Sequence, residues 1–205
     1  MHGIIWGTEM VTHNIRAFAF AILGFAFGTY IIIFLLTQDL SSIDFAKALS
    51  HITTTISINI IFWLAFIKLL WKFKLFYPWL VQVPDLSGKW EGTINSNWEN
   101  GDLNPIPMEI TIEQTFLNVQ VRIKTEESRS FSLGASFNID KDRGQQQLFY
   151  SYLNTPKPGV RERSGIHYGS ALLLFDGFEV DDMEGEYWTS RETTGEMNLK
   201  RVKDA

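Results

Sequence analysis

The 205-residue chain contains no cysteine. A disulfide-stapled domain, a zinc site built on thiolates and a thiol nucleophile are therefore excluded. The chain has only four histidines, and none stands in a metal-binding spacing such as H-E-x-x-H. It also lacks a G-x-S-x-G nucleophile motif and a phosphate-binding P-loop. These absences predict a protein that is not an enzyme and that uses no metal or other cofactor.

Positive charge is scarce in the second half of the chain. Residues 1–83 carry five Lys and Arg against three Asp and Glu, a net charge of +2, whereas residues 84–205 carry 13 against 20, a net charge of −7. A binder of DNA or RNA polymers needs a basic face against the phosphates, so the acidic half argues against that class. A small anionic ligand in a local pocket remains open. The change in composition predicts two domains, 1–83 and 84–205.

Long uncharged runs occupy the first half. Residues 17–36 and 48–67 each form 20 residues without a charge, which as helices match the roughly 30 Å hydrocarbon core of a bilayer. We predict two transmembrane helices that form an antiparallel hairpin. Arg16 precedes the first run and three lysines follow the second, so the positive-inside rule predicts that both termini are cytoplasmic. The mixed Lys and aromatic segment 68–83 is typical of a headgroup interface, and we expect Pro78 and Pro84 to break the helix and mark the domain boundary.

Small and polar residues mark one face of each predicted span. Gly24 and Gly28 form a G-x-x-x-G, a spacing that lets two helix backbones approach closely. The spacing leaves open whether that face meets the second span or a neighbouring chain. In the second span, Asn59 follows Thr55 by one turn, and such polar groups should face a partner helix or water rather than lipid. We predict Gly24, Gly28 and Asn59 as residues of membrane assembly.

The second half alternates apolar and polar residues with a period of two, which predicts β-strands. About eight strands are expected, at 88–95, 106–113, 117–124, 131–139, 147–153, 165–175, 182–190 and 194–202. In the fourth, the pattern predicts Phe131, Leu133, Ala135 and Phe137 on one apolar face. Short antiparallel strands of this kind close into an eight-stranded β-barrel, with a β-sandwich as the alternative.

Several strands place aromatic rings at positions expected to point into the barrel, and two loops carry arginine. Rings of this kind can stack nucleobases, and arginine suits phosphate or carboxylate. The candidate ligand-binding residues are Trp90, Tyr150, Tyr152, Arg161, Arg163, Tyr168, Tyr187 and Arg191. The alternative is that the rings are core residues and the arginines are solvated loop residues.

Two segments that follow the hairpin carry a resemblance: PDLSGKWEG at 84–92 and MEGEYWTSRETTGEMNLKR at 183–201. With the two spans, they resemble the two-transmembrane, β-strand-rich effectors of CBASS, the bacterial anti-phage systems that signal with cyclic oligonucleotides. The matching residues are Trp90 and Gly92 at the barrel start, and Gly185, Tyr187 and Arg191 in the last hairpin.

The resemblance implies a function in antiviral defence by abortive infection. A CD-NTase makes a cyclic dinucleotide, the barrel binds it, the effector forms a homo-oligomer, and the helices disrupt the lipids of the bacterial inner membrane. The alternative is a membrane-tethered, lipocalin-like barrel that binds a lipid or another apolar small molecule. A membrane-anchored enzyme is the least favoured reading, because no catalytic set is present.

Overall fold

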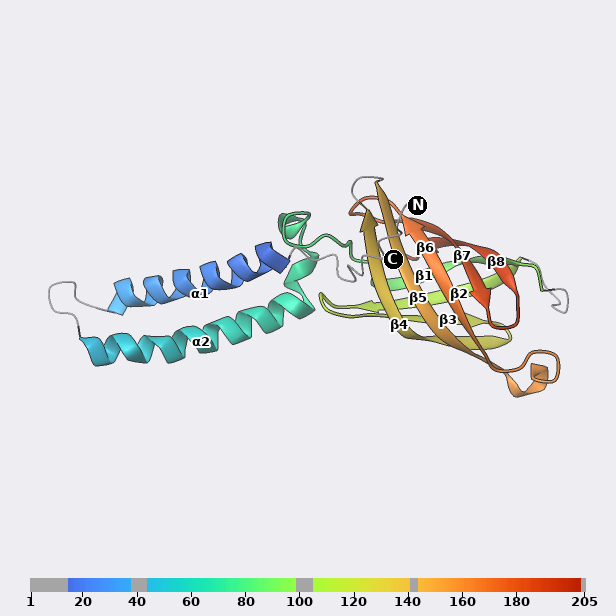
Figure 1. Cartoon of the computed structure of the whole chain (residues 1–205), viewed down its shortest axis with the longest axis horizontal. Coiled ribbons are helices and arrows are strands. Elements are labelled where there is room, and N and C mark those ends of the chain that lie inside the picture. Colours follow the sequence, from blue (N-terminus) through green and yellow to red (C-terminus); the bar gives the residue numbers. More distant parts are fainter. Residues whose placement is uncertain (1–14, 38–43, 99–104, 141–143, 204–205) are drawn as a thin grey trace, which may run out of the picture. The chain divides into compact units, whose positions relative to one another are not determined.

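The computed structural model describes residues 15–37, 44–98, 105–140 and 144–203. The chain divides into two compact units, one ending at Gln82 and the other beginning at Val83. The first is helical and the second is built of β-strands, as Figure 1 shows. Each unit is considered by itself below.

The helical unit contains α1 (Ile15–Thr37) and α2 (Phe45–Lys68), both long and apolar enough to cross a membrane. Aromatic contacts show that the two helices are antiparallel neighbours: the rings of Phe18 and Trp63 lie 5.2 Å apart, and those of Phe25 and Phe62 stack at 4.0 Å. The Asp44 side chain caps α2 by accepting a hydrogen bond from the backbone N–H of Lys47. The predicted hairpin is confirmed. These contacts come from within the helical unit alone.

The second helix ends before the prolines that follow it. After Lys68 the chain continues as two single 3₁₀ turns, η1 (Leu70–Lys72) and η2 (Lys74–Phe76). The expectation that Pro78 ends the helix is therefore wrong. Leu69 already leaves the helical conformation while its N–H still bonds to the Ala65 carbonyl.

Polar groups of α2 face α1, as expected. Asn59 Nδ2 donates to Thr29 Oγ1 at 3.1 Å, and His51 Nε2 forms a hydrogen bond of 3.0 Å with Thr37 Oγ1. In contrast, no atom of another element lies within 4 Å of a Cβ built on Gly24 or Gly28. The alternative in which the glycine face packs against the second span is therefore contradicted.

The β unit is a closed barrel of eight antiparallel strands, in which each strand pairs with its neighbours in sequence and β8 pairs with β1. The strands are β1 (Gly88–Ser96), β2 (Ile106–Gln114), β3 (Val119–Thr125), β4 (Ser128–Asp140), β5 (Gln145–Pro156), β6 (His167–Phe175), β7 (Asp182–Thr189) and β8 (Thr194–Arg201). One further 3₁₀ turn, η3 (Pro158–Val160), lies between β5 and β6. Closure leaves no free sheet edge and excludes the sandwich alternative.

Close strand contacts explain Gly92 and Gly185, two of the glycines on which the resemblance rests. A Cβ on Gly92 would lie 1.8 Å from the Asn198 carbonyl oxygen of β8, and one on Gly185 would lie 2.2 Å from the Leu172 oxygen of β6. A side chain at either position would push the neighbouring strand away. These glycines therefore serve the packing of the barrel wall.

One end of the barrel is closed by side chains. Trp90, fully buried, donates from Nε1 to the Leu86 carbonyl at 3.0 Å, and the Arg201 guanidinium stacks over its ring at 4.4 Å. Arg201 also donates to the carbonyls of Asp85, Ser87 and Val180, each at 2.8 Å. Arg201 thus connects the segment before β1 to the last strand, and it closes this end of the barrel core.

The β4 strand does not keep the simple alternation that its sequence suggests. A β-bulge between Ser132 and Gly134 shifts the register, so Phe131 and Leu133 point outward while Ala135 and Phe137 pack against the core. The prediction of one apolar face along β4 is therefore wrong. The bulge inverts the pattern and turns Ser130 inward instead.

Candidate ligand site at the open end of the barrel

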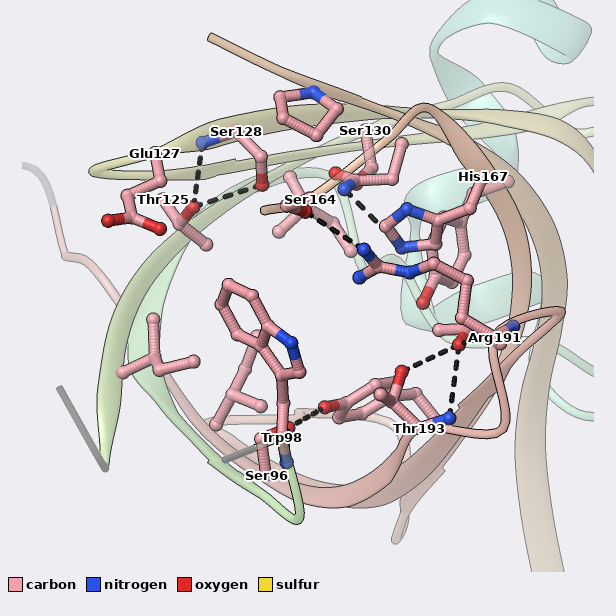
Figure 2. Close-up of a pocket in the computed structure, with 18 of the residues that line it drawn as sticks. Ser96, Trp98, Thr125, Glu127, Ser128, Ser130, Ser164, His167, Arg191 and Thr193 are labelled. Carbon is pink, nitrogen blue, oxygen red and sulfur yellow. Dashed lines mark hydrogen bonds between the residues drawn. The ribbon is translucent and has the colours of Figure 1, made fainter. Parts of the chain in front are cut away.

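A cavity of about 260 Å³ opens at the end of the barrel away from Trp90. Every strand contributes at least one lining residue. Figure 2 looks into this cavity and shows polar side chains around its wall, with Trp98 and Arg191 projecting into the space between them. Enclosed cavities with a few convergent polar groups are the usual form of small-molecule sites.

A chain of hydrogen bonds runs along one wall. Ser130 Oγ donates to Asn154 Oδ1 at 2.8 Å, and Asn154 Nδ2 lies 3.4 Å from His167 Nε2. His167 Nδ1 lies 2.9 Å from the Gly165 carbonyl, which can only accept, so Nδ1 carries the proton and Nε2 accepts from Asn154. Burial lowers the pKa of His167, the Gly165 bond opposes that shift, and the charge of Arg191 adds to it. The wall therefore presents a neutral histidine and an oriented amide.

Tyrosine side chains form the floor of the cavity. Tyr150 is fully buried, and its hydroxyl has no hydrogen-bond partner among the described residues. Burial raises the pKa of both Tyr150 and Tyr152, so both phenols stay neutral. Tyr187 donates to Ser96 Oγ at 2.6 Å, and burial raises its pKa too. The Tyr150 hydroxyl is thus a donor that a ligand can satisfy, and an unsatisfied buried donor is costly.

Arg191 is held at the mouth by the β7–β8 turn. Thr189 Oγ1 accepts from the backbone N–H of Arg191 at 3.2 Å and of Thr193 at 3.3 Å, and Glu192 takes the left-handed φ of 62° that the turn requires. Arg191 Nη1 donates to Ser164 Oγ at 3.0 Å, whereas its buried Nε has no partner among the described residues. Burial lowers its pKa, but a guanidinium remains charged. A cation with a free donor therefore faces the cavity.

Two guanidinium groups lie close to one indole ring at the rim of the cavity. The Arg163 and Arg191 groups lie 5.5 Å and 5.8 Å from the centre of the Trp98 ring. Arg163 also pairs with Glu127. Cation–π contacts of this kind hold the ring and both charges in one cluster.

The eight candidate residues separate into three groups. Tyr150, Tyr152, Tyr187 and Arg191 line the cavity. Arg161 and Arg163 do not line it: Arg161 Nε donates to the Pro156 carbonyl, whereas Arg163 reaches the rim through Trp98.

The other two candidates lie elsewhere. Trp90 belongs to the closed end, where its N–H is already satisfied. The expected inward orientation of Tyr168 is wrong, because its side chain is 61% exposed on the outer surface and His167 points inward. The sequence predicts the alternation along β6 but not its phase, so Tyr168 was expected on the inner face that His167 in fact occupies.

Sequence reasoning missed Trp98, Ser130, Asn154, Ser164 and His167. Asn154 had a readable signal, because it continues the inward phase of Tyr150 and Tyr152. A polar residue at the end of an otherwise apolar inward row indicates a lined cavity rather than a packed core. Trp98 and Ser164 lie in loops, where no periodicity predicts orientation.

No group of three His, Asp or Glu side chains able to hold a metal occurs in the part of the chain that the structure describes. The fold and the cavity define a small-ligand receptor: an eight-stranded barrel in a chain that also carries two helices able to span a membrane.

Comparison with known proteins gives the particular family. Residues 81–201 match the family described as "Cap15, cyclic dinucleotide receptor domain". The chain is 30% identical over 152 residues to CD-NTase-associated protein 15 of Staphylococcus schleiferi, a match that covers 74% of this chain and 79% of that protein. It is 36% identical over 142 residues to the protein of the same name from Yersinia aleksiciae, with 68% and 65% covered. A third such protein, from Escherichia albertii, is 29% identical over 164 residues, with 78% and 80% covered.

The chain belongs to the Cap15 cyclic dinucleotide receptor family, which confirms the resemblance to CBASS effectors. The family supports a cyclic dinucleotide as the ligand and points to a non-catalytic effector.

Proposed function

We propose that the cavity at the open end binds a cyclic dinucleotide made by a CD-NTase, and that binding drives self-association of the helices and disruption of the inner membrane. The observation that carries the binding step is Arg191, a part-buried cation whose buried Nε has no partner among the described residues, held beside the Trp98 ring. Phosphate suits the guanidinium, and a base suits the indole face. The neutral Asn154 amide and Tyr150 phenol, deeper in the cavity, would then meet the edge of a base.

The polarity of the cavity favours a nucleotide over an apolar ligand. Asn154, His167, Ser130 and the free Tyr150 hydroxyl lie where a lipid tail would have to lie. Ser130, Asn154 and His167 already have hydrogen-bond partners in one another, but a tail would leave the Tyr150 hydroxyl and Arg191 Nε, which have no partner among the described residues, buried and unsatisfied. A lipocalin-like role is therefore the less favoured function.

The helices carry two features that support assembly. The Gly24 and Gly28 face is open, so a second copy can approach it. The hairpin also leaves His51 Nδ1, Thr55 Oγ1 and Asn59 Oδ1 buried without a hydrogen-bond partner among the described residues. Such groups are costly in a bilayer, and new partners or water in an assembly would satisfy them. Asn59 thus serves the hairpin and, in this proposal, the assembly too.

The orientation follows from charge. Arg16 in the first turn of α1 and Lys68 at the end of α2 favour cytoplasmic termini, which place the barrel on the side where the nucleotide is made. The ligand shifts assembly only by binding the assembled state more tightly than the free one.

Calorimetric titration of the full chain in detergent with a panel of cyclic dinucleotides tests the proposal. We expect one member to bind, and Arg191→Ala to weaken its binding by about 10- to 100-fold, because a charge-assisted bond to phosphate is worth about 1.5–3 kcal/mol. Arg161→Ala is the matched control and should leave the dissociation constant unchanged, since Arg161 does not line the cavity. Equal loss in both variants, or a co-purified lipid that blocks titration, would overturn the assignment.

A further inference from the structure

Three polar side chains form a continuous row across neighbouring strands of the cavity wall. Ser130 on β4 stands directly opposite Asn154 on β5, and Asn154 stands directly opposite His167 on β6. All three are buried and line the cavity, and Figure 2 shows Ser130 and His167 on the same side of it. Buried polar groups need hydrogen-bond partners, so the groups that this row leaves over indicate what can enter the cavity.

The hydrogen bonds of the row fix which way the Asn154 amide faces. The Gly165 carbonyl holds the proton on His167 Nδ1, so His167 Nε2 can only accept, and it takes one hydrogen of Asn154 Nδ2. On the other side, Ser130 Oγ donates to Asn154 Oδ1 at 2.8 Å. A flipped amide would set its oxygen against the lone pair of His167 Nε2. Ser130 and His167 are therefore positioning residues for Asn154.

The Asn154 amide keeps one edge for a ligand. Ser130 and His167 lie on the strands to either side of Asn154, so the amide oxygen points along the row to β4 and the nitrogen points to β6. These are the bonds of the amide within the part of the chain that the structure describes, and each uses one of two positions. One lone pair and one N–H remain side by side, and their shared edge points into the cavity. An asparagine amide bonds two neighbouring groups of a nucleobase through this edge, as it does with adenine.

The polar row occupies one side of the cavity. In the closed order of eight strands, β5 lies opposite β1, and the wall formed by β1 and its neighbours presents Ile94, Ile106 and Met197. Of the described residues that line the cavity, Asn154 is the one with an amide side chain. The hydrogen-bonding edge of one base therefore has one place to face, and the apolar parts of the ligand meet the opposite wall.

The cavity has room for part of a cyclic dinucleotide. Its volume of about 260 Å³ lies below the range of about 300–1,000 Å³ that is typical of pockets enclosing a whole drug-sized ligand. Two nucleosides joined by two phosphates form a larger ligand than that. With Arg191 and Trp98 together at the mouth, one base can enter the barrel while the second stays at the rim.

We propose that the cavity reads one base of the dinucleotide, through the free edge of Asn154, and leaves the second base unread. This inference rests on the function proposed above and adds which part of the ligand decides specificity. Ser130 and His167 contribute by orienting the amide. Dinucleotides that share the base read inside the barrel are then equivalent ligands, whatever their second base.

Titration of the full chain in detergent tests the reading of a single base. The probes are the symmetric and mixed cyclic dinucleotides of adenine, guanine, cytosine and uracil, all with the same linkage. We expect the symmetric member and the mixed members that carry one particular base to bind within about threefold of one another, and all others at least tenfold more weakly. One member that binds tenfold more tightly than every member sharing a base with it would show that both bases are read. That result, or equal affinity across the panel, would overturn the inference.

Ser130 variants separate positioning of the amide from packing of the wall. Ser130→Ala removes the hydrogen bond that orients Asn154, so the ratio of affinities between accepted and rejected members should fall several-fold. Ser130→Thr keeps the hydroxyl and should preserve the ratio. Ser151→Ala, which removes a hydroxyl on the outer side of β5, is the matched control and should also preserve it.

Asn154→Leu removes both groups of the reading edge at similar volume. We expect accepted and rejected members to bind this variant within about threefold of one another, and thermal unfolding shows whether its barrel is folded. An unchanged ratio in both Asn154→Leu and Ser130→Ala would overturn the inference. Arg191→Ala should weaken all members alike and keep the ratio, so failure of the phosphate contact is distinguishable from failure of base reading. Absence of binding by every member would overturn the proposed function, and this inference with it.

Discussion

At the scale of single residues, the cavity depends on groups that have a partner and groups that do not. The Tyr187 hydroxyl donates to Ser96 Oγ, whereas the Tyr150 hydroxyl has no hydrogen-bond partner among the described residues. Removal of the hydroxyl group is therefore expected to have different effects at these two tyrosines of one cavity.

Tyr150→Phe should weaken cyclic dinucleotide binding by about tenfold without loss of barrel stability, because the hydroxyl it removes bonds to no described residue. Tyr187→Phe is the control, and should lower the free energy of unfolding by about 1 kcal/mol, because it breaks a 2.6 Å hydrogen bond. Titration and thermal unfolding of both variants measure this. Reduced stability of Tyr150→Phe would show that its hydroxyl already has a partner.

His167 predicts a pH dependence. Burial holds its pKa below the value of about 6.5 that it has in the unfolded chain, so protons bind the unfolded chain more readily. The contribution of neutral His167 is therefore complete above about pH 6.5 and falls as the pH drops toward its folded pKa, by about 1.4 kcal/mol for each unit of depression. His167→Gln should flatten the decline in unfolding midpoint between about pH 7 and pH 5. An unchanged pH profile would contradict a neutral, buried role.

At the scale of elements, the two faces of α1 have different surroundings. Rings and Thr29 meet α2, while Gly24 and Gly28 meet nothing of another element within 4 Å. The G-x-x-x-G spacing alone left both roles open, because spacing identifies a face but not its neighbour.

Gly24→Ile with Gly28→Ile should abolish killing of cells that contain the CD-NTase, while ligand titration remains normal. The added side chains fill the open face and keep a second backbone away. Leu23→Ile with Phe27→Ile, at exposed neighbouring positions, is the control and should still kill. Persistent killing by the glycine variant would remove this face from the assembly.

The β4 strand shows how far an element can be predicted. Its existence, type and approximate ends follow from alternation, and the eight strands match the periodic segments closely. The bulge could not be predicted, because it leaves alternation visible on both sides of Leu133 while reversing which face it serves. The error on β6 has a different origin, because the register of β6 has no bulge: its phase was predicted the wrong way round, so Tyr168 was expected inside where His167 lies.

At the scale of the whole molecule, barrel closure depends on residues far apart in the chain. Arg201, at the end of β8, donates to the carbonyls of Asp85 and Ser87, which precede β1, and to that of Val180, which precedes β7. No local pattern marks this arginine as different from other strand-end cations such as Lys200.

Arg201→Met should lower the free energy of unfolding by about 3 kcal/mol, because three part-buried carbonyls lose a charged donor. Lys200→Met, exposed on the same strand, should change it by less than about 0.5 kcal/mol. Denaturant unfolding of the full chain, followed by the β-sheet signal, gives both values. Similar midpoints for the two variants would show that the carbonyl network is not a stabilising closure.

By itself, the sequence determined the class of each part of this protein. Two runs of twenty uncharged residues predict two helices long enough to span a membrane, and period-two alternation over eight segments predicts an antiparallel β domain, because both signals are local and repeat. The pairing of β8 with β1 then decided for a barrel over a sandwich. The tertiary structure decided which side chains share the cavity. Ser130, Asn154, His167 and Arg191 come from four separate segments, and their meeting depends on strand register, on the β4 bulge and on the β7–β8 turn. Register and bulges arise from pairing between distant segments, so no window of sequence contains them.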